Sequence, residues 1–189
     1  SDANISYYGV FLNEYRAESR DNPAPDDWLL SGRRAVDLNH EWRISDALRL
    51  NTLVYSSETW RDYWRFGTNA AASGAARSWV QTDSLNGNNR AFERTGIDSR
   101  LQWEHSLFGL QSESELGLRY MTEAMDDMTI AAVRATPRTG AISRDVRDAA
   151  DSVALYAQNR LQLTETVAVT AGLRIENYEQ TRKDRRRTP

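Results

Sequence analysis

The stretch that decides the fold is TVAVTAGLRIENYEQ, residues 166–180. From position 167 to position 175 every odd residue is apolar, and the even residues are small or polar. The apolar positions are Val167, Val169, Ala171, Leu173 and Ile175. A period of two residues predicts a β-strand with one apolar face and one polar face. The class of protein depends on which of these faces meets water.

The same alternation recurs elsewhere in the chain. It is found in residues 35–44, 47–55, 95–105, 111–121 and 152–163. A shorter strand is expected in ANISYY, residues 3–8. The sequence therefore predicts an all-β fold of six or seven strands.

The joins between these strands are of two kinds. Those at residues 45–47, 107–109 and 164–166 are short and indicate hairpin turns. Those at residues 9–33, 56–91 and 122–151 are long. Because the two kinds alternate, we expect an antiparallel up-and-down meander with its long loops at one end.

Two architectures produce this pattern, and they differ in the medium that meets the apolar face. A soluble sandwich turns that face toward its core. An outer-membrane barrel turns it toward lipid, and has short periplasmic turns and long extracellular loops. Strand length and loop asymmetry favour a segment of a large transmembrane β-barrel, because soluble strands average about five or six residues. Leu173 is then expected to meet lipid, and Arg174 a polar lumen.

The composition excludes several classes of protein. The chain of 189 residues contains no cysteine, which rules out disulfides and cysteine-ligated metals. Its formal net charge is −3, so no basic face for a nucleic-acid partner is indicated. Two distant histidines, His40 and His105, are expected to be structural, and no catalytic or metal-binding constellation is found.

Three segments resemble a known family. Residues 156–182, with Gly-Leu-Arg-Ile-Glu at 172–176, resemble a hairpin typical of TonB-dependent outer-membrane receptors. LGLRYMTEA, residues 116–124, resembles a second such strand. Residues 5–23 resemble a segment of ferric-citrate-type receptors. The matching positions there are Tyr7, Gly9, Val10, Glu14, Tyr15, Asn22 and Pro23, with Val10 standing where the family has leucine.

The resemblance implies that residues 1–189 are one partial receptor barrel domain, without the plug, in a bacterial outer membrane. The implied ligand is a ferric chelate, either ferric citrate or another siderophore, so iron would arrive chelated and no resident cofactor or enzyme activity is expected. The implied partners are outer-membrane lipid, lipopolysaccharide and, through a missing N-terminal part, the TonB–ExbB–ExbD complex.

The candidate ligand contacts lie in two segments. In TWRDYWRF, residues 59–66, parity puts Arg61, Tyr63 and Arg65 on one face, which we expect to line the lumen, with the tryptophans facing lipid. Arginines there could clamp carboxylates, although an aromatic girdle at the membrane interface would have a similar composition. In residues 122–151, Arg134 and Arg138 could belong to a gate over an anionic iron complex, or to a solvated loop of mixed charge.

Two other function classes remain open from the residues. One is a passive, porin-like outer-membrane channel, which a plug encoded upstream would exclude. The other is a soluble all-β binding module, which would fold as a monomer without detergent.

Overall fold

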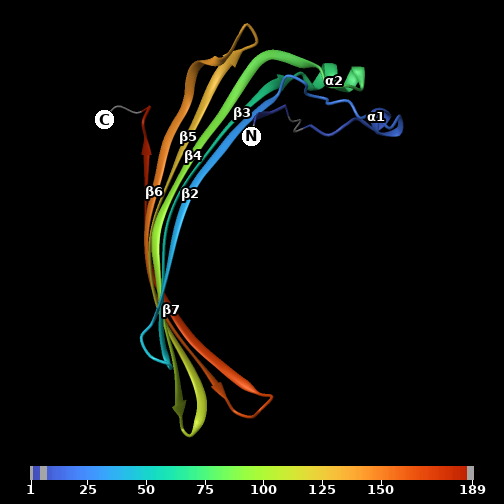
Figure 1. Ribbon diagram of the computed structural model, residues 1–189. Helices are drawn as coiled ribbons and strands as arrows, with labels where there is room; N and C mark the ends of the chain where they lie inside the picture. Colours follow the sequence, from blue (N-terminus) through green and yellow to red (C-terminus); the bar gives the residue numbers. More distant parts are fainter. Residues whose placement is uncertain (1, 5–7, 187–189) are drawn as a thin grey trace.

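The computed structural model describes residues 2–4 and 8–186 and shows one curved antiparallel sheet (Figure 1). Its strands follow one another in chain order, which confirms the predicted all-β meander. They are β1 (Asp2–Ala3), β2 (Trp28–Arg43), β3 (Leu48–Thr68), β4 (Gln81–Leu107), β5 (Leu110–Val133), β6 (Thr136–Gln162) and β7 (Ala168–Asp184). Two short helices, α1 (Leu12–Arg16) and α2 (Ala70–Ala76), lie near the upper end in Figure 1.

The first predicted strand is shorter than expected. Only Asp2 and Ala3 form β1, paired with Leu30 and Leu29 of β2. Residues 5–7, which include Tyr7 of the resembling segment, lie outside the described residues.

All three predicted tight turns are present, at the lower end of the sheet in Figure 1. Between β4 and β5 the turn residues Phe108 and Gly109 have φ angles of 56° and 78°. Two consecutive positive φ values are typical of a type I′ turn, whose twist matches that of the flanking strands.

Two of the predicted long loops are wrong. Residues 56–91 are mostly strand, because β3 continues to Thr68 and β4 begins at Gln81, with α2 between them. Residues 122–151 form the upper part of the β5–β6 hairpin, which turns after Val133. The alternation fades there because polar side chains occur on both faces, whereas backbone pairing continues.

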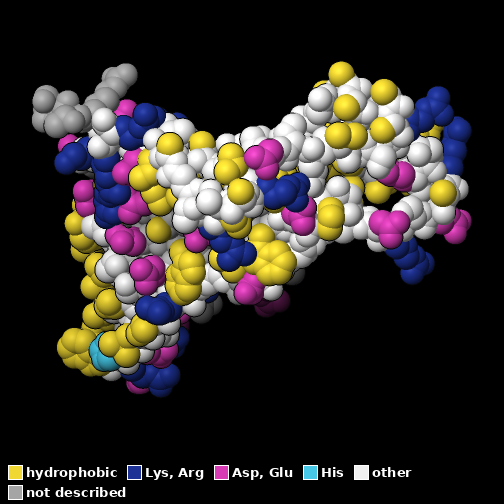
Figure 2. All heavy atoms as spheres, turned by 90° about the horizontal axis from the view of Figure 1, so that it is seen from above, with side chains coloured by type: hydrophobic (Ala, Val, Ile, Leu, Met, Phe, Trp, Pro, Cys, Tyr) yellow, Lys and Arg dark blue, Asp and Glu magenta, His cyan; other side chains and the backbone are white. Residues whose placement is uncertain are grey.

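The strand register gathers the apolar positions onto one face. Leu50 pairs with Leu101, Leu101 with Leu116, Leu116 with Ala157, and Ala157 with Leu173. Directly paired residues of neighbouring strands point to the same side, so these residues form one apolar belt. Leu173 is 69 % exposed, which is expected for a side chain that meets lipid. Figure 2, seen from above, shows hydrophobic side chains along its left margin, the convex side of the wall.

Above the belt, the same face carries a buried apolar cluster. Its buried members are Trp64, Phe66, Leu85 and Ala132, with Trp28 and Ile130 packed against them. Trp64 has the parity of the belt, as predicted, but it is only 4 % exposed. Its partner Gly87 is ten residues beyond Ile97 of the belt, about 34 Å along β4. Trp64 therefore belongs to a packed core above the belt, and the predicted lipid contact of this tryptophan is wrong.

Within the described ranges no helix has the length and apolar character needed to cross a membrane.

Candidate functional site: an arginine-rich inner wall

The face opposite the apolar belt is largely polar, and its net charge at the level of the belt differs from that nearer the upper end of the sheet. We call its part above the belt the upper inner wall. Arginines predominate there: Arg33, Arg61, Arg65, Arg90, Arg94, Arg144 and Arg182, against Glu123, Asp127, Asp148 and Asp184. At the level of the belt the two signs balance: Arg43, Arg49, Arg100, Arg119, Arg160 and Arg174, against Asp37, Glu41, Asp98, Glu104, Glu113, Glu115 and Glu176. The upper inner wall therefore has an excess of positive charge.

The excess is concentrated where Arg61 of β3 lies directly opposite Arg90 of β4. Like charges in this arrangement destabilise a sheet. Arg61 has no ion pair among the described residues, and its Nε is buried without a hydrogen-bond partner there. Arg61 and Arg90 are therefore neighbouring cations, and only Arg90 has an ion-pair partner among the described residues.

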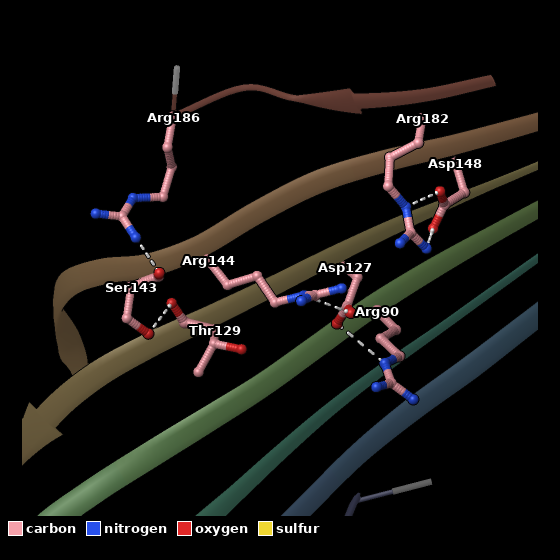
Figure 3. A network of polar contacts seen from close by, with 8 residues as sticks. All are labelled: Arg90, Asp127, Thr129, Ser143, Arg144, Asp148, Arg182 and Arg186. Carbon is pink, nitrogen blue, oxygen red and sulfur yellow. Dashed lines mark hydrogen bonds and ion pairs between the residues drawn. The ribbon is translucent and has the colours of Figure 1, made fainter.

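One carboxylate serves two of the neighbouring arginines. Asp127 accepts a hydrogen bond from Arg90 Nε at Oδ1, 3.0 Å away, and one from Arg144 Nε at Oδ2, 2.9 Å away (Figure 3). The carboxylate is almost fully buried, and both of its oxygens are occupied. Arg90 and Arg144 therefore share a single negative charge, and Arg61 is the direct strand partner of Arg90.

Two further arginines of this wall are individually neutralised. Arg182 donates from Nε and Nη2 to the two oxygens of Asp148, at 2.6 Å and 3.0 Å (Figure 3). These hydrogen bonds are the main reason that the pKa of Asp148 lies below its usual value, with desolvation acting in the opposite direction. Arg94 pairs with Glu123 at 2.5 Å. The unbalanced charge thus stays around Arg61, Arg90 and Arg144.

A hollow of about 570 Å³ opens on this wall beneath the three arginines. Its lining is partly apolar, with Phe92, Met125 and Tyr178, and partly charged with both signs. The charged lining residues are Arg33, Arg94 and Arg182, against Glu93, Glu123 and Asp148. Apolar surface beside a few placed charged groups is the usual make-up of a small-molecule site.

The structure brings three of the predicted ligand residues together. Arg61, Tyr63 and Arg65 alternate along the inner side of β3, as their parity predicts. Arg65 also lies over the Tyr63 ring, 5.2 Å from its centroid. Whether these side chains contact a ligand stays a prediction.

The other two predicted residues lie elsewhere, at the tip of the β5–β6 hairpin. Arg134 forms an ion pair with Asp26 at 2.5 Å and lies over the Phe66 ring, 4.2 Å from its centroid. Arg138 lies 5.8 Å from the centroid of Trp28. These contacts tie the hairpin tip to the segment before β2 and to the apolar cluster of the outer face, so the five residues do not form one site.

Sequence reasoning missed Arg90, Arg94 and Arg182 as members of the site. Arg90 was assigned to a loop, and its relation to Arg61 depends on the pairing of β3 with β4. The available signal was parity, because Arg90 and Arg94 are in phase with Asp98 and Arg100 of the same strand.

No group of three or more histidine, cysteine, aspartate or glutamate side chains in the described part of the chain could hold a metal ion. His105 stacks on Trp103 with ring centroids 4.2 Å apart and shares a hydrogen bond with Ser114.

Comparison with known families gives a match over the whole chain. The model of the TonB dependent receptor-like β-barrel matches residues 1–189. No curated protein sequence matches.

Several solved structures share the fold. The unliganded ferric citrate transporter FecA is 17 % identical with a TM-score of 0.78, over 94 % of this chain and 25 % of its own. The closed form of the ferric-catecholate import receptor Fiu from E. coli K12 is 15 % identical with a TM-score of 0.69, over 85 % and 25 %. The ferric preacinetobactin receptor BauA from Acinetobacter baumannii is 12 % identical with a TM-score of 0.66, over 84 % and 26 %. The chain spans about a quarter of the length of these proteins.

Proposed function

Because the chain belongs to the family of TonB-dependent receptor β-barrels, we propose that it forms part of the wall of a bacterial outer-membrane receptor that takes up an anionic ferric chelate. The observation that carries this proposal is that Arg90 and Arg144 share the single carboxylate of Asp127, while Arg61, directly opposite Arg90, has no ion pair among the described residues. An anion bound there would neutralise charge that the protein itself leaves unbalanced.

The chemistry of guanidinium groups suits this role. Arginine stays charged at any physiological pH and binds carboxylate and similar oxygen anions through two parallel hydrogen bonds. An anion between Arg61 and Arg90 turns their mutual repulsion into attraction of both toward the ligand. Citrate and catecholate, which appear in the names of two structural neighbours, are anionic iron chelators.

The proposed contacts from the wall are Arg61, Tyr63 and Arg65, together with Arg90 and Arg144. Arg134 and Arg138 hold the hairpin tip above them, and direct contact of these two with the ligand stays a prediction. The apolar belt meets outer-membrane lipid, and the charged ends of the strands above it meet lipopolysaccharide.

Uptake would draw its energy from the TonB–ExbB–ExbD complex, acting on other parts of the receptor. The direct test is accumulation of radioactive iron by cells that produce the receptor, supplied as ferric citrate or as a ferric catecholate, with and without a functional TonB. We expect saturable uptake of at least one chelate that disappears without TonB. Uptake that persists without TonB would instead support a passive channel, and the absence of uptake and binding for both chelates would refute the proposal.

A further inference from the structure

The middle of the upper inner wall carries a row of residues in direct register across six strands. The row consists of Arg33, Thr59, Phe92, Met125, Asp148 and Arg182. Phe92 of β4 and Met125 of β5 are direct partners at its centre. Their side chains therefore lie side by side on the inner face, about 5 Å apart at Cβ.

This central pair is apolar, whereas the next inner-face residues along the two strands, Arg90, Arg94, Glu123 and Asp127, are charged. Phe92 is 38 % exposed, and Tyr178, which lines the same hollow, is 54 % exposed. Neither ring belongs to the apolar cluster of the outer face, which is built from Trp64, Phe66 and Leu85. We call the direct pair of Phe92 and Met125 the apolar strip; Tyr178 lines the same hollow four residues from Arg182, which is the position of β7 in the row.

Arginines flank the strip, and three of them are paired with carboxylates: Arg90 with Asp127, Arg94 with Glu123 and Arg182 with Asp148. Arg90 lies two residues above Phe92 on β4 and Arg94 two residues below, each about 7 Å away along the strand. Arg33 and Arg182 stand at the two ends of the row. No ion pair is found for Arg33 among residues 2–4 and 8–186, so its charge is available to a ligand.

Apolar side chains beside arginine–carboxylate pairs and the arginine Arg33 fit a ligand that is itself amphipathic. A flat aryl ring can stack on Phe92 and contact the polarisable thioether of Met125. Its anionic oxygens would then point toward the arginines, which also favour aromatic faces. A small chelate with carboxylate and hydroxyl groups alone would cover the strip without any matching apolar surface.

We propose that the chelate recognised by this wall carries an aryl group, and that Phe92, Met125 and Tyr178 select for it over an entirely polar carboxylate chelate. This inference rests on the proposed function and adds the chemical class of the ligand to it.

The test is equilibrium binding to the full-length receptor, followed by quenching of intrinsic tryptophan fluorescence, with a ferric catecholate and ferric citrate as probes. The wild type is expected to bind the ferric catecholate more tightly. Phe92→Ala should weaken binding of the catecholate complex by about tenfold, from the lost stacking and contact area, and change ferric citrate by less than about twofold. Phe108→Ala is the matched control, because Phe108 is 89 % exposed in the turn at the opposite end of the sheet.

Phe92→Leu gives a second, milder variant, which keeps apolar volume but removes the aromatic face. It should lie between the wild type and Phe92→Ala for the catecholate complex. Equal affinity of the wild type for both chelates, or an equal loss for both in the Phe92 variants, would overturn the aryl inference and leave the proposed uptake function standing. Failure of the wild type to bind either chelate would instead refute the proposed function.

Discussion

Replacing Arg61 with glutamine should separate a binding role from a structural one, because the two roles predict opposite changes in stability. In the ligand-free receptor the substitution removes a like-charge pair with Arg90, which relieves about 0.2–1 kcal/mol of repulsion. Arg61 has no ion pair to lose among the described residues. We therefore expect the free energy of unfolding to stay constant or to rise by up to about 1 kcal/mol.

Binding should change in the other direction. A charge-assisted hydrogen bond contributes about 1.5–3 kcal/mol, so Arg61→Gln should weaken binding of an anionic ferric chelate by roughly 10- to 150-fold. The two measurements are guanidinium-induced unfolding of the full-length receptor in detergent micelles and titration with the chelate under the same conditions.

Arg147→Gln is the matched control on the opposite face of the same wall. Arg147 donates to Glu93 at 3.0 Å and to Asp126 at 2.8 Å, and its side chain is about one-third exposed. Its loss should cost about 0.5–1 kcal/mol of stability and leave chelate affinity unchanged. The reasoning fails if Arg61→Gln behaves like this control, losing stability while binding normally.

Two further predictions concern the membrane belt and the segment that leads into β2. Leu155→Arg, on the lipid face, should lower the free energy of unfolding by about 2–4 kcal/mol in lipid bilayers. Gln158→Arg, on the inner face, should lower it much less. Comparable losses for the two variants in urea unfolding would count against the assignment of the faces. Burial raises the pKa of Asp27 above its ordinary value of 3.8, although its Oδ1 accepts a hydrogen bond from the backbone N–H of Phe66. Because the pKa of Asp27 is higher in the folded than in the unfolded state, its protonation contributes to the free energy of unfolding. This contribution is fully present below pH 3.8 and is lost as the pH rises through the pKa of the folded state. Asp27→Asn should therefore make the receptor more stable at neutral pH and remove this pH dependence in thermal unfolding, and a destabilised Asn variant would refute the argument.

The sequence could predict the membrane belt and the turns because both are encoded locally. Leu173 and Arg174 differ sharply in polarity, and the medium on each side of the wall imposes that contrast at every second residue. Phe108 and Gly109 likewise form their turn within a few residues.

The extramembrane strands and the binding face could not be predicted in the same way. Above the belt polar side chains occur on both faces, so neighbours such as Glu93 and Arg94, or Asp126 and Asp127, show no contrast although they point to opposite sides. The opposition of Arg61 and Arg90 depends on the register of strands that α2 separates in the chain. Parity can place each residue on a face, but only the pairing shows which arginines lie side by side.

The central claim is that the polar face of this wall points inward and its apolar face meets lipid, and site-directed spin labelling tests it most directly. The chain contains no cysteine, so a single introduced thiol at each position from 168 to 176 gives one defined label in this segment. In lipid bilayers the account predicts that accessibility to oxygen, which concentrates in lipid, alternates with a period of two, with a maximum for the label at Leu173 and a minimum for that at Arg174. Uniform accessibility along the strand, or a maximum at Arg174, would contradict it.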